Sequence, residues 1–328
     1  MSSIFTIFNN INKSASDGSL FNVQSIPGTA HKIGASAEGY PMFFVSTSDN
    51  DSMVQNLNAE LLSVNYNVHC KILENDEIKE NVIFSIIILR SKDKDLQSLF
   101  IEFFRLFLCD NKTLTTIQLA IKIEGLMDIF SALKKAPVHK LQGLWAELLL
   151  IETSNDPTIM AKAWHSNPES KYDFTFGKDK IEVKSTSSER RTHHFSLDQL
   201  NPSENSRLLI ASIIVRESGE SSNGLSINNL YERICNKISD IDLQVHVYTI
   251  IVSTLGKDFA KANEKFFDYV GGYDSLKFAD YINVPKIKKE SVPELVSDVK
   301  FTSDITGSDN IKDNPQDYLD SELFKAVL

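Results

Sequence analysis

The sequence predicts a mixed α/β protein in which helices flank β-sheets. Two observations lie in the second half of the chain: a period-two alternation between Lys171 and Ser187, and a β-branched run from Arg207 to Val215. The third is apolar residues at helical spacing from Leu96 to Phe107, which indicates a core-facing helix. At 328 residues, the chain can hold two domains, or one domain with additions.

Residues 1–137 are expected to form an N-terminal α/β module that serves recognition or assembly. Its predicted elements are a strand over 40–45, a hairpin of strands 67–73 and 82–89, and helices over 96–107 and 114–133, the last ended by Pro137. Residues 138–301 are expected to form the second domain. Residues 302–328 are expected to be a polar linker, over 302–320, followed by a short C-terminal helix.

The second domain is expected to begin with a buried helix, because Leu141–Ile151 is apolar almost all round. Glu147 is the one charge within Leu144–Ile151, and a lone buried carboxylate needs a partner, a proton or a metal. The other predicted elements are a strand edge at 161–164, a capping box at Ser196 and Gln199, a central strand at 207–215, a helix capped by Ser226, a helical stretch from about Leu243 broken at Gly271-Gly272, and weak strands at 282–287 and 299–301.

The segment Lys171–Ser187 is predicted to be a hairpin with a two-residue turn at Gly177-Lys178, which suits type II′ geometry. That register places Asp173 opposite Glu182, with Lys184 one step along on the same face. A four-residue loop would keep this face and shift the pairing. A simple three-residue loop would put Asp173 and Glu182 on opposite faces.

Two carboxylates and a lysine on one sheet face can hold Mg²⁺ and an attacking water beside a phosphodiester. The lysine supplies a movable positive charge whose pKa responds to its surroundings. A solvated cross-strand salt bridge is the alternative interpretation of Glu182 and Lys184. For Glu147, two interpretations stay open: a metal ligand, or a carboxylate paired with a lysine or arginine of the core.

The net charge of −10 argues against a protein that coats nucleic acid by bulk electrostatics. Between Lys171 and His194, however, six residues are basic and four are acidic. This local excess fits an enzyme that meets phosphate at one place, or a solvated hairpin edge. The three cysteines are far apart, and neither a secretory signal nor a long apolar stretch occurs. We therefore expect a cytoplasmic protein with no membrane contact.

The order of Glu147 on a helix, then Asp173, then Glu182-Val183-Lys184 resembles the PD-(D/E)XK nuclease superfamily. Residues 138–200 resemble, more narrowly, a group of bacterial proteins of this superfamily that is linked to restriction and phage-defence systems. The run R-T-H-H-F-S-L-D-Q-L from Arg191 to Leu200 supports this. Tyr172 departs from the motif, which has proline before the aspartate. The resemblance implies a restriction-endonuclease-like core of mixed β-sheet flanked by helices.

The resemblance also implies residue roles and partners. Asp173, Glu182 and Lys184 would be catalytic; Asp173, Glu182 and Glu147 would bind Mg²⁺, for which Mn²⁺ can substitute; and Gln199 would be an accessory polar group. The implied function is cleavage of double-stranded DNA, with partner subunits of a restriction or defence system, or a homodimer. The alternatives are a catalytically inactive subunit that binds DNA or partners, and a repair or RNA nuclease of the same chemistry.

Four residues near the hairpin are candidate contacts to the DNA backbone: Lys178, Arg190, Arg191 and His193. A solvated loop explains the two arginines equally well. His193 could instead be a structural hydrogen-bonder.

Overall fold

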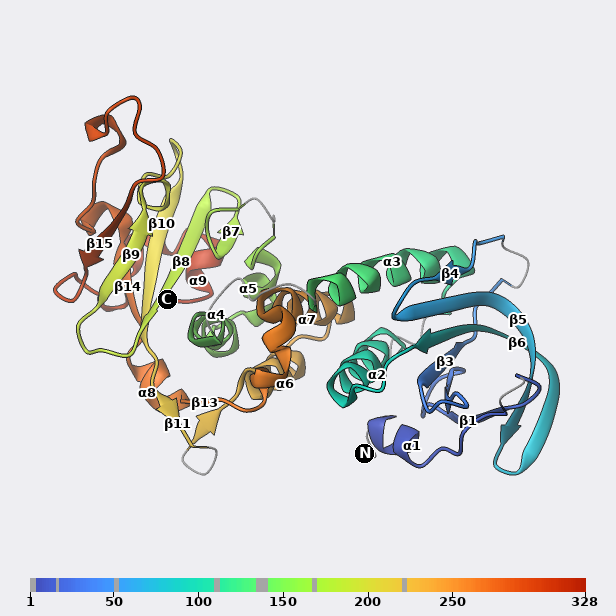
Figure 1. The fold of residues 1–328 in the computed structure, drawn as a ribbon. Coiled ribbons are helices and arrows are strands. Elements are labelled where there is room, and N and C mark those ends of the chain that lie inside the picture. Colours follow the sequence, from blue (N-terminus) through green and yellow to red (C-terminus); the bar gives the residue numbers. More distant parts are fainter. Residues whose placement is uncertain are drawn as a thin grey trace. The chain divides into compact units, whose positions relative to one another are not determined.

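The computed structural model describes residues 4–15, 18–49, 53–108, 113–133, 141–166, 170–219 and 223–328. The chain divides into two compact units, Met1–Ser131 and Ala132–Leu328. Both units combine β-sheets with helices, so the mixed fold class predicted from the sequence is confirmed (Figure 1).

The first unit is built around a six-stranded sheet with the order β1-β2-β3-β6-β5-β4. β1 also pairs in parallel with β5, so the sheet closes on itself. The predicted hairpin is β5–β6, and its turn residues Asn75 and Asp76 both have positive φ, as a type I′ turn requires. The elements are α1 (Ile4–Asn9), β1 (Phe21–Ser25), β2 (Lys32–Ala35), β3 (Pro41–Val45), β4 (Leu57–Asn58), β5 (Leu62–Glu74), β6 (Glu77–Leu89), α2 (Lys94–Leu108) and α3 (Thr116–Leu133).

The core of this unit includes the apolar stripe that predicted α2. Phe100 and Phe104 are buried, and their rings lie 5.4 and 4.6 Å from the ring of Phe43 on β3. Aromatic pairs at these distances stabilise a core beyond the area that they bury. Pro137, expected to end the next helix, lies outside the described residues.

The second unit contains a four-stranded sheet with the order β14-β10-β8-β7. β8 and β10 run parallel, and the two outer pairs are antiparallel, so the sheet is mixed. The predicted central strand is β10. The strands of this unit are β7 (Phe174–Phe176), β8 (Asp179–Thr186), β9 (Thr192–Ser196), β10 (Arg207–Ile214), β11 (Glu217–Ser218), β12 (Gly224–Leu225), β13 (Phe266–Asp268), β14 (Lys277–Asp280) and β15 (Lys300–Asp304).

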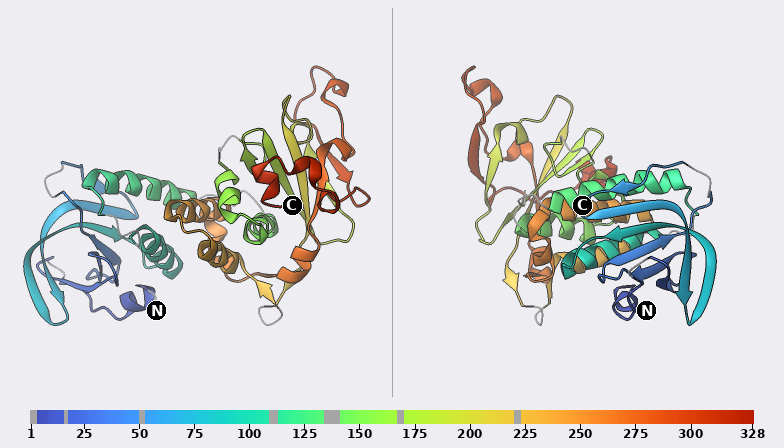
Figure 2. Two further views of the ribbon diagram at one scale, coloured as in Figure 1. Left: turned by 180° about the vertical axis from the view of Figure 1, so that it is seen from behind. Right: turned by 45° about the vertical axis from the view of Figure 1, so that its right-hand side comes forward.

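Helices pack against this sheet. α4 lies against β8 and buries every residue from Leu144 to Glu152, as its apolar sequence predicted. α9 also packs against β8 and crosses the strands in the left-hand view of Figure 2. The helices are α4 (Leu141–Thr153), α5 (Pro157–Ala163), α6 (Ile227–Lys237), α7 (Ile241–Leu255), α8 (Tyr269–Asp274) and α9 (Glu322–Lys325), with short 3-10 turns that include η1 (Leu197–Gln199) and η3 (Tyr281–Asn283).

The hairpin of β7 and β8 has the predicted register. Phe174 pairs with Ile181 and Phe176 with Asp179, which leaves Gly177 and Lys178 as the turn. Gly177 has a φ of +57°, the conformation that glycine adopts at no steric cost. One step further along this register, Asp173 stands opposite Glu182.

Three expectations about local structure are wrong. Residues 161–163 end helix α5, and Trp164 forms an isolated bridge with Phe174. Gly271 and Gly272 lie within α8, which Asp268 caps by accepting a hydrogen bond from the Gly271 N–H. The weak strand expected over residues 282–287 is absent, because Tyr281–Asn283 form η3 directly after β14.

The linker expected over residues 302–320 is instead an ordered part of the second unit. Its first residues continue β15, which pairs with β9, and Ile305 is fully buried. Asn310 Oδ1 accepts a hydrogen bond from the N–H of Phe278 at 3.0 Å, and the Tyr318 hydroxyl donates to Asp280 at 2.5 Å. Polar side chains that suggested a linker therefore bind β14.

Candidate functional site

Glu182 lies on β8 and is 3% exposed. Its Oε1 accepts hydrogen bonds from Nζ of Lys184 at 2.7 Å and from Nε2 of Gln199 at 2.5 Å. Its Oε2 is buried and has no hydrogen-bond partner among the residues that the structure describes. A buried polar atom without a partner costs folding free energy. A ligand that binds this oxygen would therefore stabilise the protein.

Asp173 lies directly before β7, where the ladder with β8 ends. Its Oδ2 accepts a hydrogen bond from the N–H of Val183 at 2.7 Å, which fixes the carboxylate beside Glu182. Burial raises the pKa of Asp173 well above its usual range, and the negative charges of Glu182 and Glu147 raise it further. Burial also raises the pKa of Glu182, although Lys184 acts in the opposite direction. The two acids destabilise each other's charged forms.

Glu147 projects from α4 and is buried. Its Oε2 accepts a hydrogen bond from the indole Nε1 of Trp164 at 2.8 Å and lies 3.1 Å from Nε2 of His165. The lysine or arginine partner considered from the sequence is not found in the described part of the chain. Glu147 is instead within the electrostatic reach of both Asp173 and Glu182.

His165 is the residue of this site that sequence reasoning missed. One ligand atom from each of Glu147, His165 and Asp173 lies within 4.8 Å of the other two, a separation that one metal ion can bridge. Residues 161–164 were expected to be a strand edge, and the histidine after them carried no recognisable spacing. The signal in the sequence was the lone Glu147, which required a partner.

Lys184 and Gln199 complete the site. The Ser196 hydroxyl accepts from the Gln199 N–H, and the Gln199 side chain accepts from the Ser196 N–H, so the predicted capping box holds Gln199 in place. Lys184 is 18% exposed, and its Nζ lies 5.1 Å from the ring centroid of Phe195. The lysine therefore reaches solvent while it remains bonded to Glu182.

The four candidate DNA contacts divide into two pairs. Lys178, at the hairpin turn, and Arg190 are exposed; Arg190 pairs with Asp304 at 2.6 Å. Arg191 donates to the Ser212 carbonyl at 2.7 Å and also to the Ser275 carbonyl. His193 is buried and bonds the Ser212 hydroxyl at 2.8 Å. Arg191 and His193 thus both make hydrogen bonds within the protein, and their contact with DNA stays a prediction.

The environment of His193 supports a structural role. Burial lowers the pKa of its imidazole to about 4, helped by the positive charges of Lys184 and Arg191. The ring is therefore neutral near pH 7 and carries no charge that would attract a phosphate.

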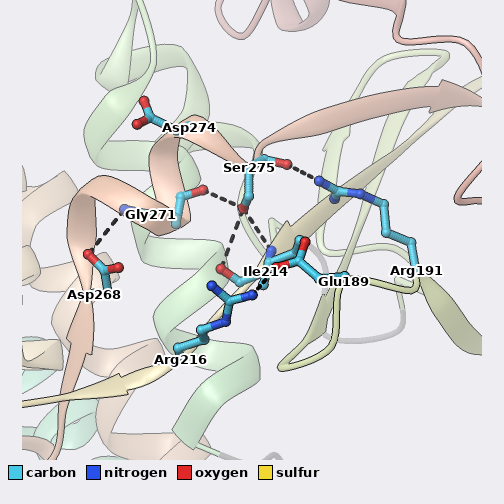
Figure 3. A pocket seen from close by; sticks show the side chains of 9 residues that line it. Glu189, Arg191, Ile214, Arg216, Asp268, Gly271, Asp274 and Ser275 are labelled. Atoms are coloured by element: carbon cyan, nitrogen blue, oxygen red, sulfur yellow. Dashed lines mark hydrogen bonds and ion pairs between the residues drawn. The ribbon is translucent and has the colours of Figure 1, made fainter.

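A cavity of about 300 Å³ lies where β8 and β10 end, and Figure 3 shows its lining. None of its lining residues belongs to the acidic site, which consists of Glu147, His165, Asp173, Glu182, Lys184 and Gln199. Two of its acids already have partners: Glu189 pairs with Arg216, and Asp268 caps α8. The acidic site, and not this cavity, contains the groups suited to hydrolysis.

The donor set of the acidic site fits a divalent cation. It provides carboxylates from Glu147 on α4 and from Asp173 directly before β7, together with the imidazole of His165. Glu182 on β8 adds one buried oxygen without a partner among the described residues. Mg²⁺ prefers oxygen ligands and keeps several waters, so two or three carboxylates from the protein are enough. The residues expected from the sequence are thus gathered in one place, with His165 added.

A helix-borne acid, an acid and a lysine on one strand of a mixed sheet, and a second acid directly before the adjacent strand are the arrangement of PD-(D/E)XK nuclease-type folds. The chain belongs to the family described as "Putative PD-(D/E)XK family member, (DUF4420)", whose model matches residues 6–306. No curated protein and no solved structure matches the chain. Family membership confirms the restriction-endonuclease-like fold and supports a nuclease-like function. Within the described ranges, no helix has the length and apolar character needed to cross a membrane.

Proposed function

We propose that this protein is a divalent-metal-dependent DNA endonuclease of a restriction or phage-defence system, with Mg²⁺ as its ion and Mn²⁺ as a substitute. The main supporting observation is Glu182, whose Oε1 is held by Lys184 and Gln199 while Oε2 has no partner among the described residues. A site built only for stability would pair this oxygen, because leaving it unpaired costs free energy.

When bound, the cation lowers the pKa of a coordinated water and neutralises charge on the scissile phosphate. Asp173, Glu182 and Glu147 would hold the cation through their carboxylate oxygens. Lys184 places an ammonium group 2.7 Å from Glu182, where it can orient the attacking water and offset charge that develops on the phosphate. Gln199 keeps the Glu182 carboxylate in one orientation through its hydrogen bond.

Lys178 and Arg190 would contact the DNA backbone, because both are exposed basic residues. The net charge of −10 leaves little non-specific attraction to DNA. Target recognition would therefore come from partner subunits or from a second copy of the chain. A homodimer would cut the two strands by symmetry.

The test is cleavage of plasmid DNA by the purified protein with Mg²⁺ or Mn²⁺. The site variants are Asp173→Asn and Lys184→Ala. Their matched controls are Asp198→Asn, a 54% exposed aspartate, and Lys162→Ala, an exposed lysine on α5. We expect wild type and both controls to cut, and EDTA and both site variants to reduce cutting by at least about a hundredfold.

Cutting that survives Asp173→Asn would contradict the proposed site. If wild type binds DNA and does not cut it, alone or with proteins encoded by neighbouring genes, the chain is the inactive nuclease-fold subunit. Preferential cleavage of RNA or of damaged DNA would support the proposed metal-dependent hydrolysis and would contradict the proposed substrate.

A further inference from the structure

His165 lies at the acidic site, and its backbone conformation is unusual for a residue other than glycine. Its φ is +41°, in the left-handed region that side-chain-bearing residues rarely adopt. The N–H of His165 donates to the backbone carbonyl of Asp173 at 2.9 Å, and the preceding Trp164 forms a bridge with Phe174. The backbones of His165 and Asp173 are thereby joined, which fixes both side chains relative to Glu147.

Trp164 and His165 approach the same oxygen of Glu147. The indole of Trp164 already satisfies Oε2 of Glu147 at 2.8 Å, and the Trp164 carbonyl is in turn bonded by Nε2 of His246 at 3.2 Å. His165 is therefore not needed to pair this carboxylate. Its side chain is 28% exposed and that of Glu147 8%, so the imidazole lies on the open side of the site.

The distances suit ligands of one cation. In an octahedral site with metal–ligand bonds of about 2.1 Å, neighbouring ligand atoms lie about 3 Å apart and opposite ones about 4.2 Å apart. Nε2 of His165 lies 3.1 Å from Oε2 of Glu147, and one ligand atom from each of Glu147, His165 and Asp173 lies within 4.8 Å of the others. These separations need only small adjustments around an ion.

We propose that His165 is a ligand of the divalent cation, and that the site consequently binds Mn²⁺ more tightly than Mg²⁺. This inference rests on the proposed function, because it assigns a ligand and an ion preference to the same site. Mg²⁺ takes oxygen ligands almost exclusively, whereas Mn²⁺, although it also suits carboxylates and binds most weakly of the divalent first-row metals, belongs to the series that accepts nitrogen ligands. The buried Oε2 of Glu182 is a further donor with no competing partner among the described residues.

The experiment uses the full-length protein and measures Mn²⁺ by electron paramagnetic resonance. Titration of the free-ion signal gives the affinity for Mn²⁺, and competition gives that for Mg²⁺. Pulsed measurements detect ¹⁴N coupling from a coordinated imidazole. The test variant is His165→Asn, because asparagine tolerates positive φ. His194→Asn is the control, since His194 is an exposed histidine bonded to Thr302 on the neighbouring β15.

We expect wild type and His194→Asn to bind Mn²⁺ more tightly than Mg²⁺ and to show ¹⁴N coupling. His165→Asn should lose the coupling and weaken Mn²⁺ binding by about tenfold or more, with a smaller loss for Mg²⁺. Far-UV circular dichroism checks its folding, and His165→Gln replaces it if it does not fold.

Bound Mn²⁺ without ¹⁴N coupling, or coupling that persists in His165→Asn, would overturn the role of His165. If cleavage still depends on Asp173 in that case, the proposed function stands. A wild-type protein that binds neither ion would overturn both the inference and the proposed function.

Discussion

Two hairpins of this chain carry buried carboxylates, and their surroundings are opposite. Glu74 precedes the turn of β5 and β6 and is 5% exposed. It accepts hydrogen bonds from Ser25, Lys32 and Lys79 at 2.5, 2.8 and 2.8 Å. Glu182, on the β7–β8 hairpin, is 3% exposed, yet one of its oxygens has no partner in the described part of the chain and its neighbours include two more acids.

The pKa values follow these surroundings. Burial alone would raise the pKa of Glu74, but hydrogen bonds from Lys32, Lys79 and Ser25 outweigh it and lower the pKa to about 2. Burial raises the pKa of Asp173, and nearby acids add to the effect. A carboxylate whose oxygens are paired with cations stabilises the fold, whereas buried carboxylates that repel one another gain stability from a bound cation. The comparison thus separates a structural cluster from a candidate binding site.

The largest expected effect is a loss of folding stability when the Glu74 cluster, Glu74 with Ser25, Lys32 and Lys79, is disrupted. Glu74→Gln removes the negative charge and leaves Lys32, only 13% exposed, without its ionic partner, although its hydrogen bond to the Ser25 hydroxyl remains. We expect the first unit to lose about 3 kcal/mol of stability. Hydrogen exchange of the β5 and β6 amides measures the stability of this unit. Glu80→Gln is the control, because Glu80 is 70% exposed, and it should change little.

The pH dependence of the same cluster has a definite sign. Because the folded pKa of Glu74 is lowered, its stabilisation is complete above the unfolded value of about 4.3 and is lost as the pH falls toward 2. Glu74→Gln should remove this slope. If both proteins lose stability equally between pH 4.3 and 2, Glu74 is not the group responsible.

The next effect is stabilisation by metal, confined to the second unit. Both tryptophans, Trp145 and Trp164, lie in that unit, so tryptophan fluorescence follows its unfolding. A cation at a hundred times its dissociation constant should add about 2.7 kcal/mol to wild type. Glu182→Gln should remove most of this gain, because it replaces an anionic ligand with a neutral amide. An equal gain in the variant would place the ion elsewhere.

A smaller effect, opposite in sign to that at Glu74, is expected at Asp173 in EDTA. Asp173→Asn keeps an oxygen that can accept from the Val183 N–H and removes an acid whose ionised form is destabilised by burial and by the charges of Glu182 and Glu147. We expect a gain on the order of 1 kcal/mol near pH 8, since binding sites commonly trade stability for function. A loss of stability would mean that Asp173 is a structural acid like Glu74.

The sequence predicted the parts of the site that depend on local rules. The turn at Gly177-Lys178 fixed the register that brings Asp173 beside Glu182, and the capping box positioned Gln199. These features follow from backbone conformation and hydrogen bonding over a few residues. The buried helix carrying Glu147 followed from its unbroken apolar surface.

The parts that were not predicted depend on contacts distant in the sequence. His165 joins the site because its backbone bonds Asp173 and its ring meets Glu147, which no spacing reveals. Arg191 was a candidate DNA contact or part of a solvated loop, and the structure shows that it donates to the carbonyls of Ser212 and Ser275. Tertiary packing decided both outcomes.

A final effect of similar size tests whether the turn itself holds the register that places Asp173 opposite Glu182. Gly177 has a φ of +57°, and an added Cβ would meet no atom within 4 Å, so Gly177→Ala acts through backbone conformation alone. We expect a cost of about 1 kcal/mol in the second unit, measured by fluorescence. The control is Gly143→Ala, also without a steric neighbour but within α4, where alanine should stabilise by about 0.5 kcal/mol. If Gly177→Ala is silent in stability and cleavage, the parallel pairing of β8 with β10 holds Glu182 and Lys184 in place, and the turn only closes the chain.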